Sequence, residues 1–171
     1  MVANPAFPRN RIRSTTMWWL DLEGAVHPFD RERFKPMTEP SAAVWMTVED
    51  DPAWLPDEAL AHVEAIAIEF PKFTDGRPFS LATILRARGW HGPLFAVGHF
   101  LLDQLDYLRR CGFTGFAPDP ERYPYETLCE LGPRLLRVFT EPYQASSAVP
   151  QPLWLRVRRD RAEQPVSEIE V

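Results

Sequence analysis

The chain has 171 residues, a formal net charge of −5 at pH 7 and a hydrophobic share of 45%. This length is enough for one domain with a sizeable core, and the hydrophobic share argues against a disordered chain. The negative charge disfavours a general role in nucleic-acid binding.

The two ends of the chain are expected to differ from its centre. Eight of the 18 prolines lie within 5–40 and 142–152, which predicts irregular or extended structure there. We expect a disordered segment at 1–16, a single α/β domain at 17–155 and an extended tail at 156–171. No stretch approaches the roughly 20 apolar residues of a membrane-spanning helix, and the apolar run at 17–20 is too short for a signal peptide. A cytoplasmic protein without a membrane partner is therefore expected.

In chain order, the sequence predicts four units of a strand followed by a helix. Residues 17–22 are expected to form a short strand or docking segment, with Trp18 and Trp19 on opposite faces and at least one of them buried. Residues 29–34 are expected to form one helical turn. The predicted strands are 42–48, 66–70, 94–97 and 113–117, and the predicted helices are 55–63, 78–88, 101–110 and 125–131. Gly132-Pro133 is expected to end the last helix, and Arg86 and Arg88 are expected to face solvent.

Strands and helices that alternate in this order favour a parallel sheet. The predicted fold class is therefore α/β, either a small open parallel sheet or half of a (β/α)8 barrel, with irregular proline-rich ends. No GxGxxG or P-loop motif is present, which lowers the expectation of a nucleotide-binding fold. A half barrel leaves two open edge strands, so we expect self-association as a homodimer.

The loop after the second predicted strand is the most informative one. It contains Lys72 and Arg77, which flank a helix start whose backbone N–H groups are free. Such a combination favours an anion such as sulfate, phosphate or a carboxylate. The structural alternative is a rigid loop in which Gly76 takes a special backbone angle, Asp75 caps the turn and Arg77 pairs with a carboxylate.

Two titratable side chains follow the second and third predicted strands at their carboxyl ends. Ligands bind at this edge of open α/β sheets, so Glu69 and His99 are the candidate catalytic residues, each as a general base. The alternative for a lone histidine is a helix-start or surface residue. Asp103, one helical turn further on, is placed to hydrogen-bond His99.

Acidic residues would gather near one face of a parallel sheet, and a solvated acidic rim is favoured there over a Mg²⁺ site. These residues are Glu49, Asp50, Asp51, Glu69, Asp75 and Asp119. The chain has no HExxH, GxSxG or CxxC motif and no flavin or iron–sulfur pattern. We therefore expect no metal site and no cofactor, and we expect Cys111 to be a packed small hydrophobe.

Five segments of the chain carry a resemblance to a known family. They are Phe-Pro-Lys-Phe-Thr-Asp-Gly-Arg at 70–77, Ala-Val-Gly at 96–98, Asp-Gln-Leu at 103–105, Leu-Arg-Arg-Cys-Gly-Phe at 108–113 and Tyr-Gln-Ala at 143–145. Together they resemble the bacterial domain of unknown function 934 family over roughly residues 43–155. The characteristic positions of that family correspond here to Lys72, Asp75, Gly76, Arg77, Gly98, Asp103, Gln104, Arg109 and Arg110. With Thr74 of the same loop, they form the set of candidate anion-binding residues.

The resemblance implies a pathway and leaves the chemistry open. Members of the family typically lie beside the haemoprotein subunit of assimilatory sulfite reductase and are described as involved in sulfite reduction. The first hypothesis is accordingly an accessory protein that binds this subunit or an anionic sulfur species. The second is a small barrel-type enzyme that acts on a phosphorylated or sulfated metabolite, with Lys72 and Arg77 as the anion clamp.

This chain departs from the family at one position. The family usually has an acidic residue after the glycine of the third loop, where this chain has His99. If that acid is a general base or a metal ligand, His99 replaces it with an altered pH dependence, or activity is lost. If it only caps the helix, little changes.

Overall fold

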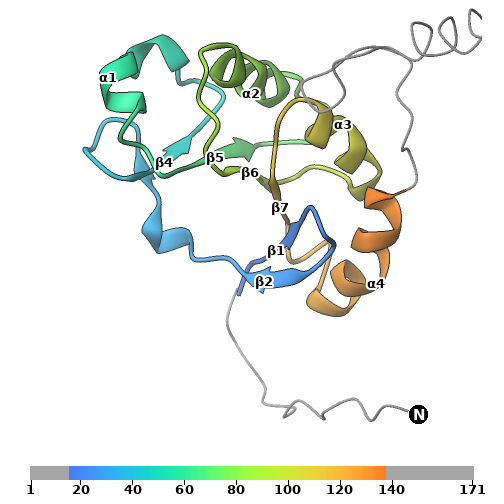
Figure 1. The fold of residues 1–171 in the computed structure, drawn as a ribbon. Coiled ribbons are helices and arrows are strands. Elements are labelled where there is room, and N and C mark those ends of the chain that lie inside the picture. Colours follow the sequence, from blue (N-terminus) through green and yellow to red (C-terminus); the bar gives the residue numbers. More distant parts are fainter. Residues whose placement is uncertain (1–15, 138–171) are drawn as a thin grey trace, which may run out of the picture.

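The computed structural model describes residues 16–137, which form an open seven-stranded sheet (Figure 1). The strands are β1 (Trp18–Asp21), β2 (Val26–Pro28), β3 (Lys35–Pro36), β4 (Ala43–Met46), β5 (Ala65–Phe70), β6 (Leu94–Gly98) and β7 (Gly115–Pro118). The helices are α1 (Asp57–Leu60), α2 (Arg77–Ala87), α3 (Leu105–Arg110) and α4 (Tyr125–Leu136). Short 3₁₀ turns are η1 (Arg31–Arg33), η2 (Pro52–Trp54) and η3 (Leu102–Gln104). None of the helices in this described range is long and apolar enough to cross a membrane.

The sheet confirms the predicted α/β class. Its strand order is β2-β1-β7-β6-β5-β4-β3, in which β3 to β7 run parallel and β1 runs antiparallel to both β7 and β2. From β4 to β7 the strands lie side by side in sequence order, as in half of a (β/α)8 barrel. The sheet does not close, and it gains two antiparallel strands at one end.

The two faces of the sheet are covered by different layers. On one face, Ile66, Ile68 and Phe70 of β5 belong to the core that the apolar sides of the four helices complete. On the other face, Ala65 and Ala67 alternate with these large side chains, and small residues leave room there for a second layer. That layer is the connection from β2 to β4, which Figure 1 shows on the opposite side of the sheet from α2. Its side chains Phe29 and Phe34 are buried.

The edges of the sheet differ from the open edges expected for a half barrel. β7 pairs with β1, with Leu20 opposite Phe116, and β4 pairs with β3. The outermost strands are then β2 and β3, which have only three and two residues and both end in proline. Short, proline-bearing edges offer little backbone for pairing with another chain. The homodimer stays a prediction, but open edges of the parallel sheet no longer support it.

The last helix corrects a second expectation. α4 does not end at Gly132-Pro133 but continues to Leu136. Leu128, Gly132 and Leu136 are spaced by four residues and buried, so they form one packed face of the helix. A Cβ at Gly132 would lie 3.0 Å from Leu20 Cδ2, which shows how closely this face approaches β1. Tertiary packing outweighs the hydrogen bond that Pro133 cannot make.

The first strand confirms one prediction and contradicts another. Trp18 and Trp19 point to opposite faces, since Trp18 lies 4.5 Å from the Tyr125 ring of α4 and Trp19 lies 5.0 Å from the Phe95 ring on the other side. Neither tryptophan is fully buried, and β1 is the second strand from one end of the sheet. The extended ends predicted at 1–16 and 156–171 lie outside the described residues, apart from Thr16.

Arg86 and Arg88, expected to face solvent, are instead bound to backbone carbonyls. The guanidinium of Arg86 donates to Gly112 O at 2.6 and 3.0 Å, and to Trp90 O and Gly92 O at 2.9 Å each. Arg88 donates to Pro52 O and Leu55 O at 2.6 Å each. Arg86 therefore ties the end of α2 to the turns that enter β6 and β7.

Replacing Arg86 by leucine should lower the free energy of unfolding by about 2–4 kcal/mol, because three carbonyl groups lose their donor in a half-buried place. Urea denaturation of the wild type and variant measures the difference. Arg33→Leu is the matched control, since Glu64 is the one described residue with which Arg33 forms an ion pair, and both side chains are more than half exposed. Its loss should not exceed about 1 kcal/mol. Equal losses in the two variants would contradict this role for Arg86.

Candidate functional site

The loop after β5 has the arrangement that the structural alternative predicted for its charges. Asp75 is buried, and its carboxylate accepts hydrogen bonds from Arg77 N at 3.0 Å, Nε at 3.1 Å and Nη2 at 2.8 Å. The Nη1 of Arg77 donates to Glu49 Oε1 at 2.9 Å. The hydrogen bond from Arg77 holds the pKa of Asp75 at about 2. Two carboxylates thus offset the one guanidinium on which anion binding was expected to depend.

The rest of this loop is exposed. Lys72 forms no ion pair among the described residues, and its carbonyl accepts from Asp75 N at 3.1 Å to close the turn. Thr74 and Gly76, on either side of Asp75, are exposed. Gly76 has φ −83°, an ordinary helical angle, so the special backbone angle expected there is wrong. The carboxylate of Asp75 also fixes the turn, by accepting the N–H of Arg77 at the start of α2.

The structure brings some of the other candidate residues to this loop and leaves others apart. Gln104 joins two loops, because its Nε2 donates to Phe73 O at 3.3 Å and its Oε1 accepts from Leu101 N at 3.0 Å. Asp103 lies exposed beside it. Arg109 and Arg110 lie in the last turn of α3, at the end of that helix that points away from the loop, and Arg109 pairs with Asp106 at 2.8 Å.

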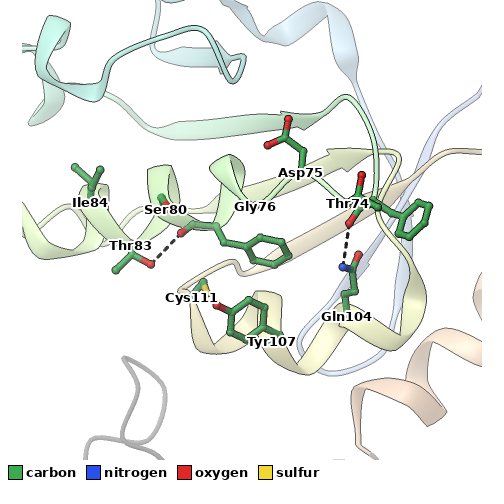
Figure 2. A pocket seen from close by; sticks show the side chains of 11 residues that line it. Thr74, Asp75, Gly76, Ser80, Thr83, Ile84, Gln104, Tyr107 and Cys111 are labelled. Carbon is green, nitrogen blue, oxygen red and sulfur yellow. Dashed lines mark hydrogen bonds between the residues drawn. The ribbon is translucent and has the colours of Figure 1, made fainter.

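A groove separates α2 from α3 next to this loop. Its volume is about 470 Å³, and it is lined by Phe73, Thr74, Asp75, Gly76, Phe79, Ser80, Thr83, Ile84, Gln104, Tyr107 and Cys111. Figure 2 shows Ser80, Thr83 and Ile84 on the α2 side and Gln104, Tyr107 and Cys111 on the other. Phe73, Ile84 and Tyr107 are 45%, 45% and 52% exposed, which is high for large apolar and aromatic side chains. Burial raises the pKa of the Cys111 thiol, so it lies in the groove as a protonated, packed group.

A second hollow lies on the opposite face of the sheet, at the carboxyl ends of the parallel strands. Its volume is about 340 Å³, and it is lined by Met17, Arg31, Trp45, Glu69, Phe70, Val97, Gly98, His99 and Asp119. We call it the edge cleft. Both catalytic candidates, Glu69 and His99, lie in it. Its position is where ligands bind in open α/β sheets.

The backbone of three strands fixes His99 in the edge cleft. His99 N donates to Phe70 O at 2.9 Å, and Asp119 N donates to Gly98 O at 2.9 Å. Gly98 has φ +102°, and a Cβ there would lie 2.9 Å from Phe70 O, so no other residue fits easily. The partner of the imidazole is Asp119, with His99 Nδ1 3.2 Å from Asp119 Oδ2, and not Asp103 as expected. Asp119 directly follows β7, the parallel neighbour of β6. The predicted order of the strands would therefore have placed Asp119 next to His99.

The sequence did not predict a binding role for two residues of the edge cleft, Arg31 and Trp45. Trp45 Nε1 donates to Glu69 Oε2 at 2.9 Å, and the Arg31 guanidinium lies over the Trp45 ring at 3.6 Å from its centroid. Arg31 belongs to the connection from β2 to β4, and no local pattern shows that this connection crosses the sheet. Trp45 was identified only as a strand residue.

The remaining acidic residues of the rim are bound to the protein itself. Asp50 accepts from Thr47 N at 2.7 Å and from its hydroxyl at 2.9 Å, and Asp51 caps η2 by accepting from Ala53 N at 2.9 Å. The described residues contain no group of three or more side chains placed to hold a metal ion. The acidic rim therefore stabilises turns at this edge of the sheet.

Arg77→Gln should raise the pKa of Asp75 from about 2 towards its ordinary value of about 4, because the donor that stabilises the carboxylate is lost. An NMR titration of the side-chain carboxyl carbon measures both values. A depressed folded-state pKa stabilises the fold above about pH 4, and this part of the stability disappears between about pH 4 and pH 2. The variant should therefore lose less stability than the wild type over that interval. An unchanged Asp75 titration would contradict the role of Arg77.

Comparison with known proteins gives one finding. A family model described as bacterial protein of unknown function, DUF934, matches residues 43–154. The matched region begins at β4 and includes the groove, the loop after β5 and the ends of β6 and β7. No curated protein and no solved structure matched the chain. Since the family model spans more than half of its residues, the chain belongs to this bacterial family of unknown function.

Proposed function

We propose that the protein is an accessory protein of assimilatory sulfite reduction and that it binds the haemoprotein subunit of the reductase, in the cytoplasm, through the groove between α2 and α3. The pathway and the partner come from the genomic setting typical of the family. The single observation that favours a protein partner over a free anion is the compensation of Arg77 by Asp75 and Glu49.

Charge balance in the loop argues against an anion site there. An anion that approaches Arg77 meets the carboxylates of Asp75 and Glu49, at 2.8 and 2.9 Å from its nitrogen atoms. Three of the five guanidinium N–H groups of Arg77 already donate to these carboxylates, so an anion would find only the remaining donors, next to two charges of its own sign. Lys72 remains as a solvated point charge, and one lysine of this kind is a weak anion site.

The groove has the features of a protein-binding surface. Three large side chains, Phe73, Ile84 and Tyr107, gather along it, each close to half exposed. Tyr107 also packs against the Phe79 ring at 4.8 Å, so its position is fixed before a partner arrives. Aromatic anchors on a preformed surface are typical of the residues that dominate binding energy in protein interfaces.

The segments that carry the family resemblance surround this groove. The loop at 70–77 supplies Phe73, Asp75 and Gly76, and the segment at 103–105 supplies Gln104. The side chains of Asp75 and Gln104 form hydrogen bonds within the protein, and these bonds fix the two loops that flank the groove. This role supports a shared docking surface better than a shared anion site.

The alternative, a barrel-type enzyme for a phosphorylated or sulfated metabolite, has less support. It requires Lys72 and Arg77 as the anion clamp, and Arg77 is already bound to two carboxylates. Its candidate bases, Glu69 and His99, lie in the edge cleft on the other face of the sheet from the groove.

Deletion of the gene should abolish growth on sulfate and on sulfite and leave growth on sulfide or cysteine unaffected. We expect the wild-type gene and the Lys72→Ala variant to restore growth of the deletion strain, and the Ile84→Glu variant to fail. If Lys72→Ala fails and sulfite raises the melting temperature of the purified wild type, the loop is an anion site, since a ligand that binds the folded state stabilises it. Normal growth of the deletion strain on every sulfur source would overturn the proposal.

Binding to the purified reductase subunit provides the direct test. Ile84→Glu should weaken binding at least about tenfold, which corresponds to about 1.4 kcal/mol. Leu22→Glu is the matched control, because Leu22 is 41% exposed and lies in the β1–β2 turn outside the groove. Equal melting temperatures would show that both variants fold. No binding by the wild type, or equal weakening by the two variants, would contradict the groove as the docking surface.

A further inference from the structure

The edge cleft contains two opposite charges that do not pair. Arg31 and Glu69 both line this hollow of about 340 Å³, yet neither forms an ion pair among the described residues. By contrast, Arg33, Arg77, Arg88 and Arg109 each pair with a carboxylate.

Trp45 contacts both of these side chains. Its indole ring lies beneath the Arg31 guanidinium at 3.6 Å from centroid to Cζ, and its Nε1 donates to Glu69 Oε2 at 2.9 Å. Arg31 is fixed further by its Nη1, which donates to Phe34 O at 2.9 Å. The ring stacking and the two hydrogen bonds give each charged group a defined position. The Arg31 guanidinium keeps N–H groups that no described residue binds, and the second oxygen of Glu69 likewise has no described partner.

The geometry points to a binding site for a small zwitterion of the amino-acid type, with its carboxylate on Arg31 and its ammonium group on Glu69. A guanidinium binds a carboxylate through two parallel hydrogen bonds, and a carboxylate is the natural partner of an ammonium group. Met17 and Val97 supply apolar surface for the side chain of such a ligand. The volume is within the range of small-metabolite pockets.

The charges around the mouth favour a zwitterion over a bare anion. The edge cleft continues into a wider hollow that shares Met17, Arg31, His99 and Asp119 with it and adds Asp30, Glu32 and Glu121. With these carboxylates nearby, sulfate or sulfite near Arg31 would be repelled from several sides. A ligand without net charge avoids this cost and satisfies Arg31 and Glu69 together.

His99 lies at the mouth of the same cleft. Its Nδ1 is bound to Asp119, and its side chain is 60% exposed, so Nε2 is the ring nitrogen that a ligand can contact. Asp119 is itself fixed, because its other oxygen accepts from Glu121 N at 3.1 Å. His99 is therefore a further hydrogen-bonding group of the site, placed where a bound ligand meets solvent.

Thermal denaturation with each of the 20 standard amino acids tests this inference. At about 10 mM, an amino acid with a Kd of about 0.1 mM should raise the melting temperature by about 5–10 °C. Arg31→Gln and Glu69→Gln should each remove the shift, whereas Arg33→Gln, in the same turn η1, should keep it. Glutamine at position 69 can still accept from Trp45, so that variant preserves the cleft. Calorimetry with the most effective amino acid then gives the affinity of each variant.

Matched probes separate a zwitterion site from an anion site. Lactate lacks the ammonium group, ethylamine lacks the carboxylate, and sulfite is a bare anion; each should raise the melting temperature less than the best amino acid. No shift with any amino acid, or an equal shift with sulfite that Glu69→Gln leaves intact, would overturn the inference. The groove variant Ile84→Glu should retain the amino-acid shift, so this inference and the proposed docking function can fail independently.

Discussion

The alternation of large and small side chains along β5 is the constraint on which the rest of the structure depends. Ile66, Ile68 and Phe70 face the helices, and Ala65 and Ala67 face the connection from β2 to β4. Because the period of a strand is two, a shift of one residue would exchange the two layers. The same alternation places Glu69 on the face with the small residues, at the carboxyl end, where the chain leaves a hollow. The same side-chain alternation along β5 therefore determines both the two-layer packing and the position of Glu69 in the edge cleft.

Two features with opposite electrostatic character lie at one edge of the sheet, on different faces. In the loop after β5, Arg77 is matched by two carboxylates, and the loop is a rigid support for the groove. In the edge cleft, Arg31 and Glu69 each contact Trp45 and form no ion pair with a described residue. In this chain, a high density of charged residues in the sequence is therefore a poor guide to a binding site, because the charges of the densest loop pair with one another. The less conspicuous residues retain the capacity to bind a ligand.

Local patterns predicted the parts of the fold that depend on local order. The periodicity of hydrophobic residues and the positions of turn residues predicted the four strand–helix units and their parallel pairing. They also placed Glu69 and His99 at the carboxyl ends of strands. Three other features depend on contacts between distant segments. The β1–β2 hairpin pairs with β7, α4 continues past Pro133, and Arg31 lies over the Trp45 ring. Arg86 shows the same limit, since its spacing indicates an exposed helix face while its carbonyl partners come from the following turns. No single-segment pattern contains such contacts.

Position 99 separates what belongs to the family from what belongs to this chain. The resemblance places an acidic residue there in most members, but in this chain the imidazole of His99 lies 3.2 Å from the carboxylate of Asp119. Since Gly98 and the hydrogen bond to Phe70 O fix the backbone at this point, an acid at position 99 would bring two like charges together. Because the side chain at position 99 is 60% exposed, such an acid would turn towards solvent and would not replace the contact of His99 with Asp119. The groove between α2 and α3 does not involve this position, so a change at residue 99 would alter the edge cleft and leave the proposed docking surface unchanged.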